Sequence, residues 1–210
     1  MNFMGYRRPD GKAGIRNKVL ILPTCVCSSE TCRIVADQVE GAIYTSNQAG
    51  CSEVEQNLKI CYDMYSGFAA NPNIYGTVLI GLGCEGCTPD KMADAIREKT
   101  NKPLAVVVIQ DEGGTVNAIN KAVKYAREFV QEASLVQKEE IPLSELFIGL
   151  ECGGSDATSG LAANPVVGKV SDLVVDNGGS AVMSETTEFI GADKLGIDLP
   201  GEKRGLIPNA

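Results

Sequence analysis

Cysteine residues stand at positions in this sequence where they could hold a metal. Cys51, Cys84 and Cys152 each lie beside a glycine and close to an acidic residue, and each follows a different strand-like segment. Three thiolates that converge could bind a mononuclear soft metal or an iron–sulfur cluster with one open iron. An open position would let the metal act as a Lewis acid on substrate oxygens. The alternative is that these cysteines are small buried residues that pack tight turns.

The composition excludes several other kinds of chemistry. The 210 residues include no His, which excludes Ser-His-Asp triads, Cys-His pairs and His-containing zinc or iron sites within the chain. A formal net charge of −8 and an aromatic content of 5% argue against nucleic acid as a partner. No apolar run reaches the roughly 18 residues that span a membrane, and no secretory signal opens the chain. We therefore expect a cytoplasmic protein that binds neither nucleic acid nor membrane.

Short apolar runs alternate with amphipathic segments along the chain. The strand-like runs are residues 18–22, 42–44, 77–81, 104–109, 146–150 and 181–183. Ser52 with Glu55 predicts a capping box, and Thr88-Pro89 predicts another helix start. The alternation predicts an α/β fold, with three α/β/α layers around a mainly parallel, Rossmann-like sheet of about six strands. Ligands of such sheets bind beyond the carboxyl ends of the strands, so we expect the polar turns to form one site.

The domain organisation is predicted from the same pattern. Residues 1–198 are expected to form one α/β domain, and residues 199–210 a tail or a linker. The charged residues 137–140, followed by Pro142, are the one stretch that could divide the chain. This stretch predicts either a boundary between two lobes near residues 137–144 or a surface loop before the fifth strand.

Two further patterns allow other interpretations. Cys84 and Cys87 form a CxxC motif between a strand and a helix, where a thiol redox module would lower one thiol pKa. Five cations, among them Arg7, Arg8 and Arg16, lie within residues 7–18. Arginine binds carboxylates through two hydrogen bonds, so this segment could hold a small anionic substrate. It could equally be a solvated terminal arm.

Four motifs resemble the altronate/galactarate dehydratase family of sugar-acid hydro-lyases. They are GYRRPDGKAGIRN at residues 5–17, GLGCE at 81–85, ECGGSDATSG at 151–160 and ETTE at 185–188. The third motif is long and unusual, and together the motifs extend over nearly the whole chain. The resemblance implies a cytoplasmic lyase, dependent on iron or another divalent metal, that removes water from a 2,3-dihydroxy acid to give a 2-keto-3-deoxy acid.

The implied reaction assigns candidate roles to residues of these motifs. Removal of a proton next to a carboxylate needs a base and an electrophile that stabilises the enediolate. The candidate bases are Glu185, Glu188, Asp156 and Glu85, besides a Lys from another domain. The candidate substrate ligands are Arg7, Arg8, Arg16, Asn17, Ser155 and Thr186. The metal ligands would be Cys51, Cys84 and Cys152, holding mononuclear Fe²⁺, an iron–sulfur cluster or another divalent metal.

The chain departs from this family in two ways. Members usually carry a His near the second turn, where this sequence has Asn47, Gln48 and Ala49. Members are also longer, with a further C-terminal domain and often a small N-terminal one. We therefore expect one domain of a larger homo-oligomeric enzyme, with those domains and an anionic sugar acid as partners. The alternatives are a non-catalytic domain that supplies substrate or subunit contacts, and the CxxC redox module.

Overall fold

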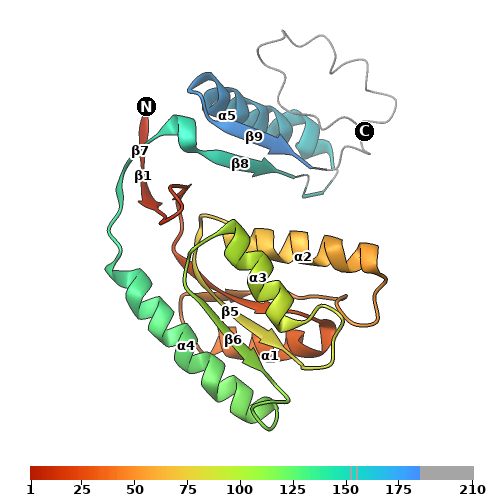
Figure 1. Cartoon of the computed structure of the whole chain (residues 1–210). Coiled ribbons are helices and arrows are strands. Elements are labelled where there is room, and N and C mark those ends of the chain that lie inside the picture. The colour runs from red at the N-terminus through yellow and green to blue at the C-terminus, as the bar shows by residue number, and fades with distance from the viewer. Residues whose placement is uncertain (152, 155, 185–210) are drawn as a thin grey trace. The chain divides into compact units, whose positions relative to one another are not determined.

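The computed structural model describes residues 1–151, 153–154 and 156–184, and the chain divides into two units. The larger unit is Met4–Glu139, and the smaller unit combines Met1–Phe3 with Glu140–Ala210. Figure 1 shows the elements of both units. No helix among the described residues combines the length and apolar character needed to cross a membrane.

Four parallel strands form the main sheet of the larger unit. In spatial order they are β4 (Ala42–Tyr44), β3 (Lys18–Pro23), β5 (Ile74–Gly81) and β6 (Leu104–Val108). Each neighbouring pair is parallel. The two central strands, β3 and β5, are almost entirely buried. They are continuously apolar because helices cover both faces of the sheet.

Two pairs of helices cover the two faces (Figure 1). One pair is α1 (Val26–Asp37) and α4 (Thr115–Leu135), and the other is α2 (Glu55–Ala70) and α3 (Pro89–Lys99). Val19 and Ile21 of β3 pack in the core with α1 and α4, whereas Leu20 and Leu22 pack with α2 and α3. Successive side chains of a strand point to opposite faces, so one strand supplies both cores.

The strand order contains a reversal that matters for function. From β3 the chain crosses to β4 on one side, and from β5 it crosses to β6 on the other side. The turns at the carboxyl ends of β3 and β5 therefore diverge. In open α/β sheets this switch point is where ligands bind.

The smaller unit contains a second parallel pairing. Its elements are the 3-10 turn η1 (Leu143–Glu145), β8 (Phe147–Leu150), the π-helical turn η2 (Ser159–Ala163), α5 (Asn164–Asp176) and β9 (Ser180–Met183). β8 pairs with β9 in a sheet of two strands. The six predicted strands thus all form, but within the described residues they do not share one sheet as predicted. Four lie in the larger unit and two in the smaller.

Three strands were not predicted from the sequence. They are β1 (Asn2–Arg7), β2 (Ala13–Gly14) and β7 (Glu139–Pro142), which form a sheet in the order β2-β1-β7. The boundary between the units falls within β1 and within β7. The predicted capping box is wrong, because α2 begins after an extended Val54 and its N-cap makes no side-chain hydrogen bond. Ser52 instead adopts a left-handed φ of 54°.

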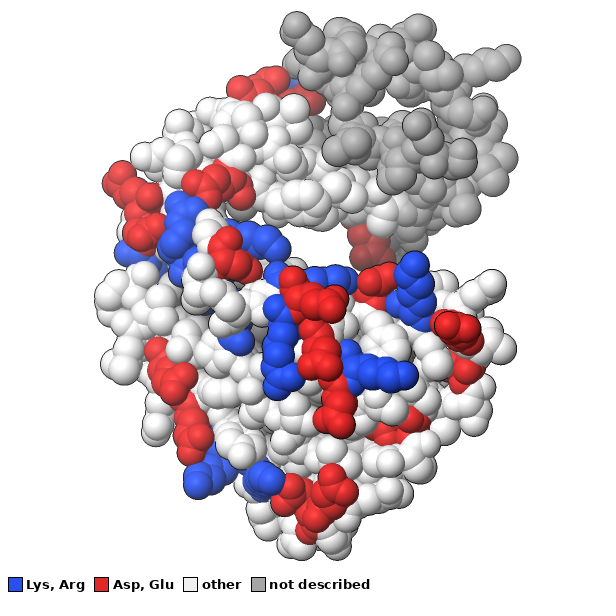
Figure 2. Space-filling view, viewed as in Figure 1, with Lys and Arg blue, Asp and Glu red and all other residues white. Residues whose placement is uncertain are grey.

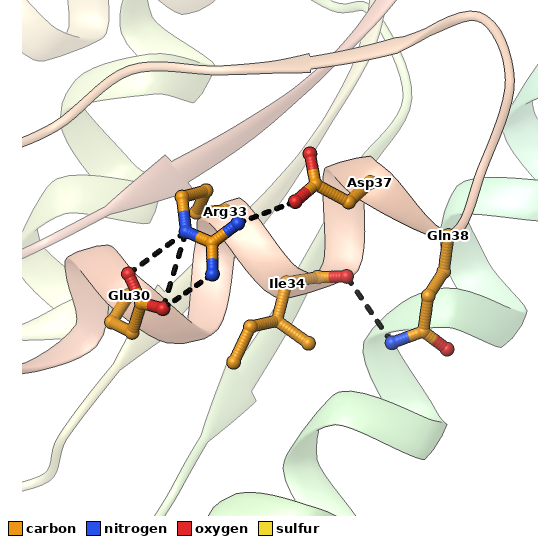
Figure 3. A network of polar contacts seen from close by, with 5 residues as sticks. All are labelled: Glu30, Arg33, Ile34, Asp37 and Gln38. Carbon is orange, nitrogen blue, oxygen red and sulfur yellow. Dashed lines mark hydrogen bonds and ion pairs between the residues drawn. The ribbon is translucent and has the colours of Figure 1, made fainter.

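The solvent face of α1 carries a network of exposed ion pairs (Figure 3). Arg33 contacts Glu30 at 2.6 Å and Asp37 at 2.5 Å, and its side chain is 42% exposed. Exposed ion pairs of this kind contribute about 0–1 kcal/mol. Burial of Cys32 and Val35 against the sheet therefore holds α1 in place more than this network does.

Candidate functional site

Three turns meet at the carboxyl edge of the main sheet. The turn after β4 is hydrogen-bonded to both of its neighbours: Val26 N donates to Ala49 O at 3.1 Å, and Cys87 N donates to Gly50 O at 2.8 Å. Gly50 has a φ of +89°, and a Cβ there would overlap the carbonyl oxygen of Thr24. Only glycine fits this close approach without strain. The edge is therefore one connected structure.

Exposed thiols from all three turns lie at this edge. Cys27 lies in the first turn of α1, Cys51 follows β4 and Cys84 follows β5, and all three are exposed. The charge of Cys25 is the largest cause that raises the pKa of Cys27, and Cys51 and Cys84 add to the increase. An effect of this kind falls off with the separation of the charges. Cys51 and Cys84 therefore both lie within electrostatic range of Cys27.

Cys27 was not among the sequence-based candidates. Cys25 and Cys27 were expected to point to opposite sides at the end of a strand. The helix instead begins at Val26, so the two residues are not related by strand alternation. Recognition of a helix start at this position would have found Cys27.

The described thiols suit a soft metal by their chemistry, because thiolates prefer such ions. Among the described residues, however, no three His, Cys, Asp or Glu side chains are placed to hold a metal ion. Cys152, the third ligand expected from the sequence, lies outside those residues. Cys51 and Cys84 are both exposed at this edge, and their role as metal ligands stays a prediction.

Glu85 links the turns on both sides of the switch point. Its carboxylate accepts hydrogen bonds from Thr24 Oγ1 at 2.5 Å, Leu82 N at 2.9 Å and Gly83 N at 2.6 Å. Burial alone would raise the pKa of Glu85, but these hydrogen bonds outweigh it and lower the pKa. A carboxylate with filled acceptors and a low pKa is a weak base at neutral pH. Its geometry suits a residue that positions the turn carrying Cys84.

The CxxC motif is divided between surface and core. Cys84 is exposed, whereas Cys87 is buried with its sulfur 3.5 Å from the sulfur of Cys61 on α2. The hydrogen bond between them lowers the pKa of Cys61 to about 7 and raises that of Cys87. Of the two thiols in this contact, the one with the lowered pKa is therefore Cys61, outside the CxxC motif.

The arginine segment lies at the opposite edge of the sheet. Arg8 donates from Nε to Pro72 O at 2.6 Å, from Nη1 to Asn17 Oδ1 at 2.7 Å and from Nη2 to Arg16 O at 2.7 Å. Pro72 lies two residues before β5, and Asn17 directly precedes β3. A strand of six residues such as β3 is roughly 20 Å long. Within the larger unit, these residues and the exposed thiols therefore do not share one site.

Other predicted site residues are placed as follows. Arg7 Nε contacts Glu139 at 3.0 Å near the amino edge, and the Arg16 side chain is exposed. Asp156, in the smaller unit, accepts hydrogen bonds from Thr158 Oγ1 and N, which lower its pKa. The predicted site residues outside the described part of the chain are Cys152, Ser155, Glu185, Thr186 and Glu188.

Comparison with protein families matches both units. Residues 5–134 match a family model described as D-galactarate dehydratase/altronate hydrolase, second domain. Residues 143–198 match one described as D-galactarate/altronate dehydratase, C-terminal. The first match spans the main sheet, its helices and the three turns at its carboxyl edge.

Individual relatives agree with these matches. The beta subunit of (2R)-sulfolactate sulfo-lyase from Chromohalobacter salexigens is 37% identical over 92% of this chain and 49% of its own length. Altronate dehydratase from Bacillus subtilis is 31% identical, over 92% of this chain and 40% of its own. Galactarate dehydratase (L-threo-forming) from Escherichia coli is 31% identical, over 89% of this chain and 39% of its own length. The chain thus spans half or less of the length of these curated relatives.

Proposed function

Since the chain belongs to the D-galactarate dehydratase/altronate hydrolase family, we propose that it is part of a lyase that acts on a sugar acid. The reaction is removal of water from altronate, galactarate or a related acid to give a 2-keto-3-deoxy acid. The observation that carries this proposal is the family match over residues 5–134, because these residues build the whole switch point with its exposed thiols. The relatives named for dehydration support the reaction type.

The chemistry assigns different tasks to different residues. In this proposal Cys51, Cys84 and Cys152 hold iron, as Fe²⁺ or a cluster, or another divalent metal. A metal bound there would supply the electrophile for the enediolate that forms when the proton next to the carboxylate leaves. Glu85 keeps the turn of Cys84 in position, because it accepts two hydrogen bonds from that turn, from Leu82 N and Gly83 N, and one from Thr24 Oγ1 across the switch point. The base is then Glu185, Glu188, Asp156 or a Lys outside this chain.

A second candidate function differs in the group that is removed. The sulfo-lyase subunit shares 37% identity with this chain, against 31% for the two dehydratases. This difference favours a test of (2R)-sulfolactate beside the sugar acids. A third possibility, a non-catalytic domain, predicts that the complete enzyme keeps its metal and activity when the edge thiols are replaced.

The experiment uses the complete enzyme, purified without oxygen and with every domain or subunit present. Iron, acid-labile sulfide and the absorption spectrum are measured for the wild type and for Cys51→Ser and Cys84→Ser, and each protein is assayed with altronate, galactarate and (2R)-sulfolactate. We expect both variants to lose bound iron and activity while circular dichroism shows an intact fold. Cys32→Ser, in the core below the edge, is the matched control and should retain iron. Full iron retention in either edge variant would exclude the proposed ligand set.

A further inference from the structure

Two cysteine side chains meet in the core on the side of the sheet that α2 and α3 cover. Cys61 lies on α2, and Cys87 lies in the turn between β5 and α3. Their sulfur atoms are 3.5 Å apart, and the two residues are 4% and 0% exposed. A disulfide bond needs about 2.05 Å between its sulfurs, so a movement of about 1.5 Å would join them.

The surroundings make Cys61 the more reactive of the two thiols. Its sulfur shares a hydrogen bond with Cys87 and accepts another from Asn47 Nδ2 at 3.7 Å. The contact with Cys87, and to a smaller extent that with Asn47, lowers the pKa of Cys61 to about 7 against the effect of burial. The thiolate is the attacking form in disulfide chemistry. Cys61 therefore offers the nucleophile, and Cys87 offers the second thiol within reach.

Burial and charge together restrict the kind of oxidant that could join these thiols. Because Cys61 is only 4% exposed, a bulky oxidant such as glutathione disulfide has little access to its sulfur. The chain carries a net charge of −8, and on the face shown in Figure 2 described Lys and Arg side chains are interspersed with Asp and Glu. That face therefore offers no broad basic surface that would attract an anionic oxidant. A small, uncharged hydroperoxide meets both restrictions.

We propose that Cys61 and Cys87 form a reversible disulfide when the protein meets hydrogen peroxide. The Cys61 thiolate attacks one oxygen of the O–O bond, becomes a sulfenic acid and releases hydroxide. The sulfur of Cys87 then attacks the sulfur of Cys61, so the S–O bond breaks and the S–S bond forms. The departing oxygen leaves as water with the proton of the Cys87 thiol. Each sulfur gives one electron, and the peroxide accepts both.

The disulfide would act on the carboxyl edge of the sheet through the turn of Cys87. Cys87 N donates to Gly50 O at 2.8 Å, and the same turn carries Cys84. A shorter distance between the two sulfurs therefore draws this turn and α2 together. Formation of the disulfide does not depend on the function proposed above, because only an effect on lyase activity would need that function.

The test locates the bond in the full chain, which is first reduced and then treated with hydrogen peroxide. Cleavage after glutamate places Cys61 in the peptide of residues 56–85 and Cys87 in the peptide of residues 86–98. Mass spectrometry without reduction should find these two peptides linked in most molecules, and dithiothreitol should separate them. Glutathione disulfide at the same concentration should link far fewer molecules. Absence of the link after peroxide, or equal linkage by both oxidants, would overturn the proposal.

Variants assign the link to its two cysteines. Cys84 lies in the same peptide as Cys61, so the link must persist in Cys84→Ser. It should disappear in Cys87→Ser and persist in Cys32→Ser, the matched control at another buried core position. If Cys87→Ser does not fold, Cys61→Ser provides the same comparison. Loss of the link in Cys84→Ser would assign it to the CxxC pair and contradict the proposal.

Unfolding in urea shows whether the native fold accommodates the disulfide. Oxidised Cys84→Ser should unfold at a higher urea concentration than its reduced form, because the disulfide restricts the unfolded chain between residues 61 and 87. Cys87→Ser, treated in the same way, should show no such increase. An unchanged or lower urea midpoint for the linked protein would mean that the bond distorts the fold, and would contradict the proposal.

Discussion

The two edges of the main sheet bury charges of opposite sign. At the carboxyl edge, the carboxylate of Glu85 is surrounded by two backbone N–H groups and one hydroxyl. At the amino edge, Arg8 and Lys102 are surrounded by carbonyl and amide oxygens. Among the residues that the structure describes, none forms a direct ion pair with these buried groups, in contrast to the exposed network around Arg33 in Figure 3.

The difference follows from how an α/β sheet is built. The carboxyl ends of strands lead into the N-termini of helices, where free N–H groups favour negative charge. The amino ends follow the C-termini of helices, where free carbonyl groups favour positive charge. Glu85 precedes α3, and one acceptor of each cation, Asn71 O for Lys102 and Pro72 O for Arg8, follows the end of α2. The chain direction thus determines the sign of charge that each edge can bury.

The largest expected effect tests how closely the turns of the carboxyl edge approach one another. Gly50→Ala would place a Cβ against the carbonyl oxygen of Thr24 and force alanine into a φ of +89°. Backbone strain and overlap together predict a loss of about 4 kcal/mol in the free energy of unfolding. Urea unfolding of the full chain measures it.

A second glycine provides the control for this prediction. Gly67 lies within α2, and a Cβ there would meet no atom within 4 Å. Gly67→Ala should therefore raise the free energy of unfolding by about 0.5–1 kcal/mol through helix propensity. If both variants behaved alike, the close contact between the turns would not hold the edge together.

The next effect concerns the charge of Glu85. Glu85→Gln keeps the shape of the side chain but places an NH₂ group against the N–H and O–H donors that the carboxylate accepts from. It should lower the free energy of unfolding by about 2.5 kcal/mol at pH 7. The lowered pKa of Glu85 stabilises the fold above the unfolded-state pKa of about 4.3, and this stabilisation is lost as pH falls through the folded-state pKa. The difference in the free energy of unfolding between wild type and variant should therefore become smaller at acidic pH. Unfolding measured between neutral and acidic pH checks this.

Glu98→Gln is the matched control for that experiment, because Glu98 is exposed on α3. It should change the free energy of unfolding by less than about 0.5 kcal/mol at either pH. A pH-independent difference for Glu85→Gln would show that shape, and not charge, holds the turn.

Much of the fold could be predicted from local sequence. The strand predicted at residues 42–44 is β4 itself, and the run at 18–22 differs from β3 by one residue, because strands buried on both faces are continuously apolar. The pairing of β8 with β9 away from the other strands could not be predicted. Strand pairing depends on contacts between segments far apart in the chain, which local patterns do not contain.

The candidate site was predictable to the level of the sheet edge. The turns after β3, β4 and β5 were expected at one edge, and hydrogen bonds from Val26 and Cys87 to the turn after β4 join them there. The environment of Glu85 was not predictable, because its partner Thr24 lies 61 positions away in sequence. For the same reason, the sequence did not reveal that Arg8 binds the carbonyl oxygen of Pro72, 64 positions away.

The smallest expected effect tests whether the shape of the Arg8 guanidinium, beside its charge, stabilises the amino edge. Arg8→Lys keeps the charge but removes the planar fork, so one ammonium must replace three donors that reach Pro72 O, Asn17 Oδ1 and Arg16 O. We expect the free energy of unfolding to fall by about 1.5 kcal/mol, because buried oxygens lose their hydrogen-bond donors. Arg33→Lys, the same substitution in the exposed network, should change the free energy of unfolding by about 0.5 kcal/mol or less. Equal effects in urea unfolding would mean that charge alone, without the geometry of the fork, stabilises the amino edge.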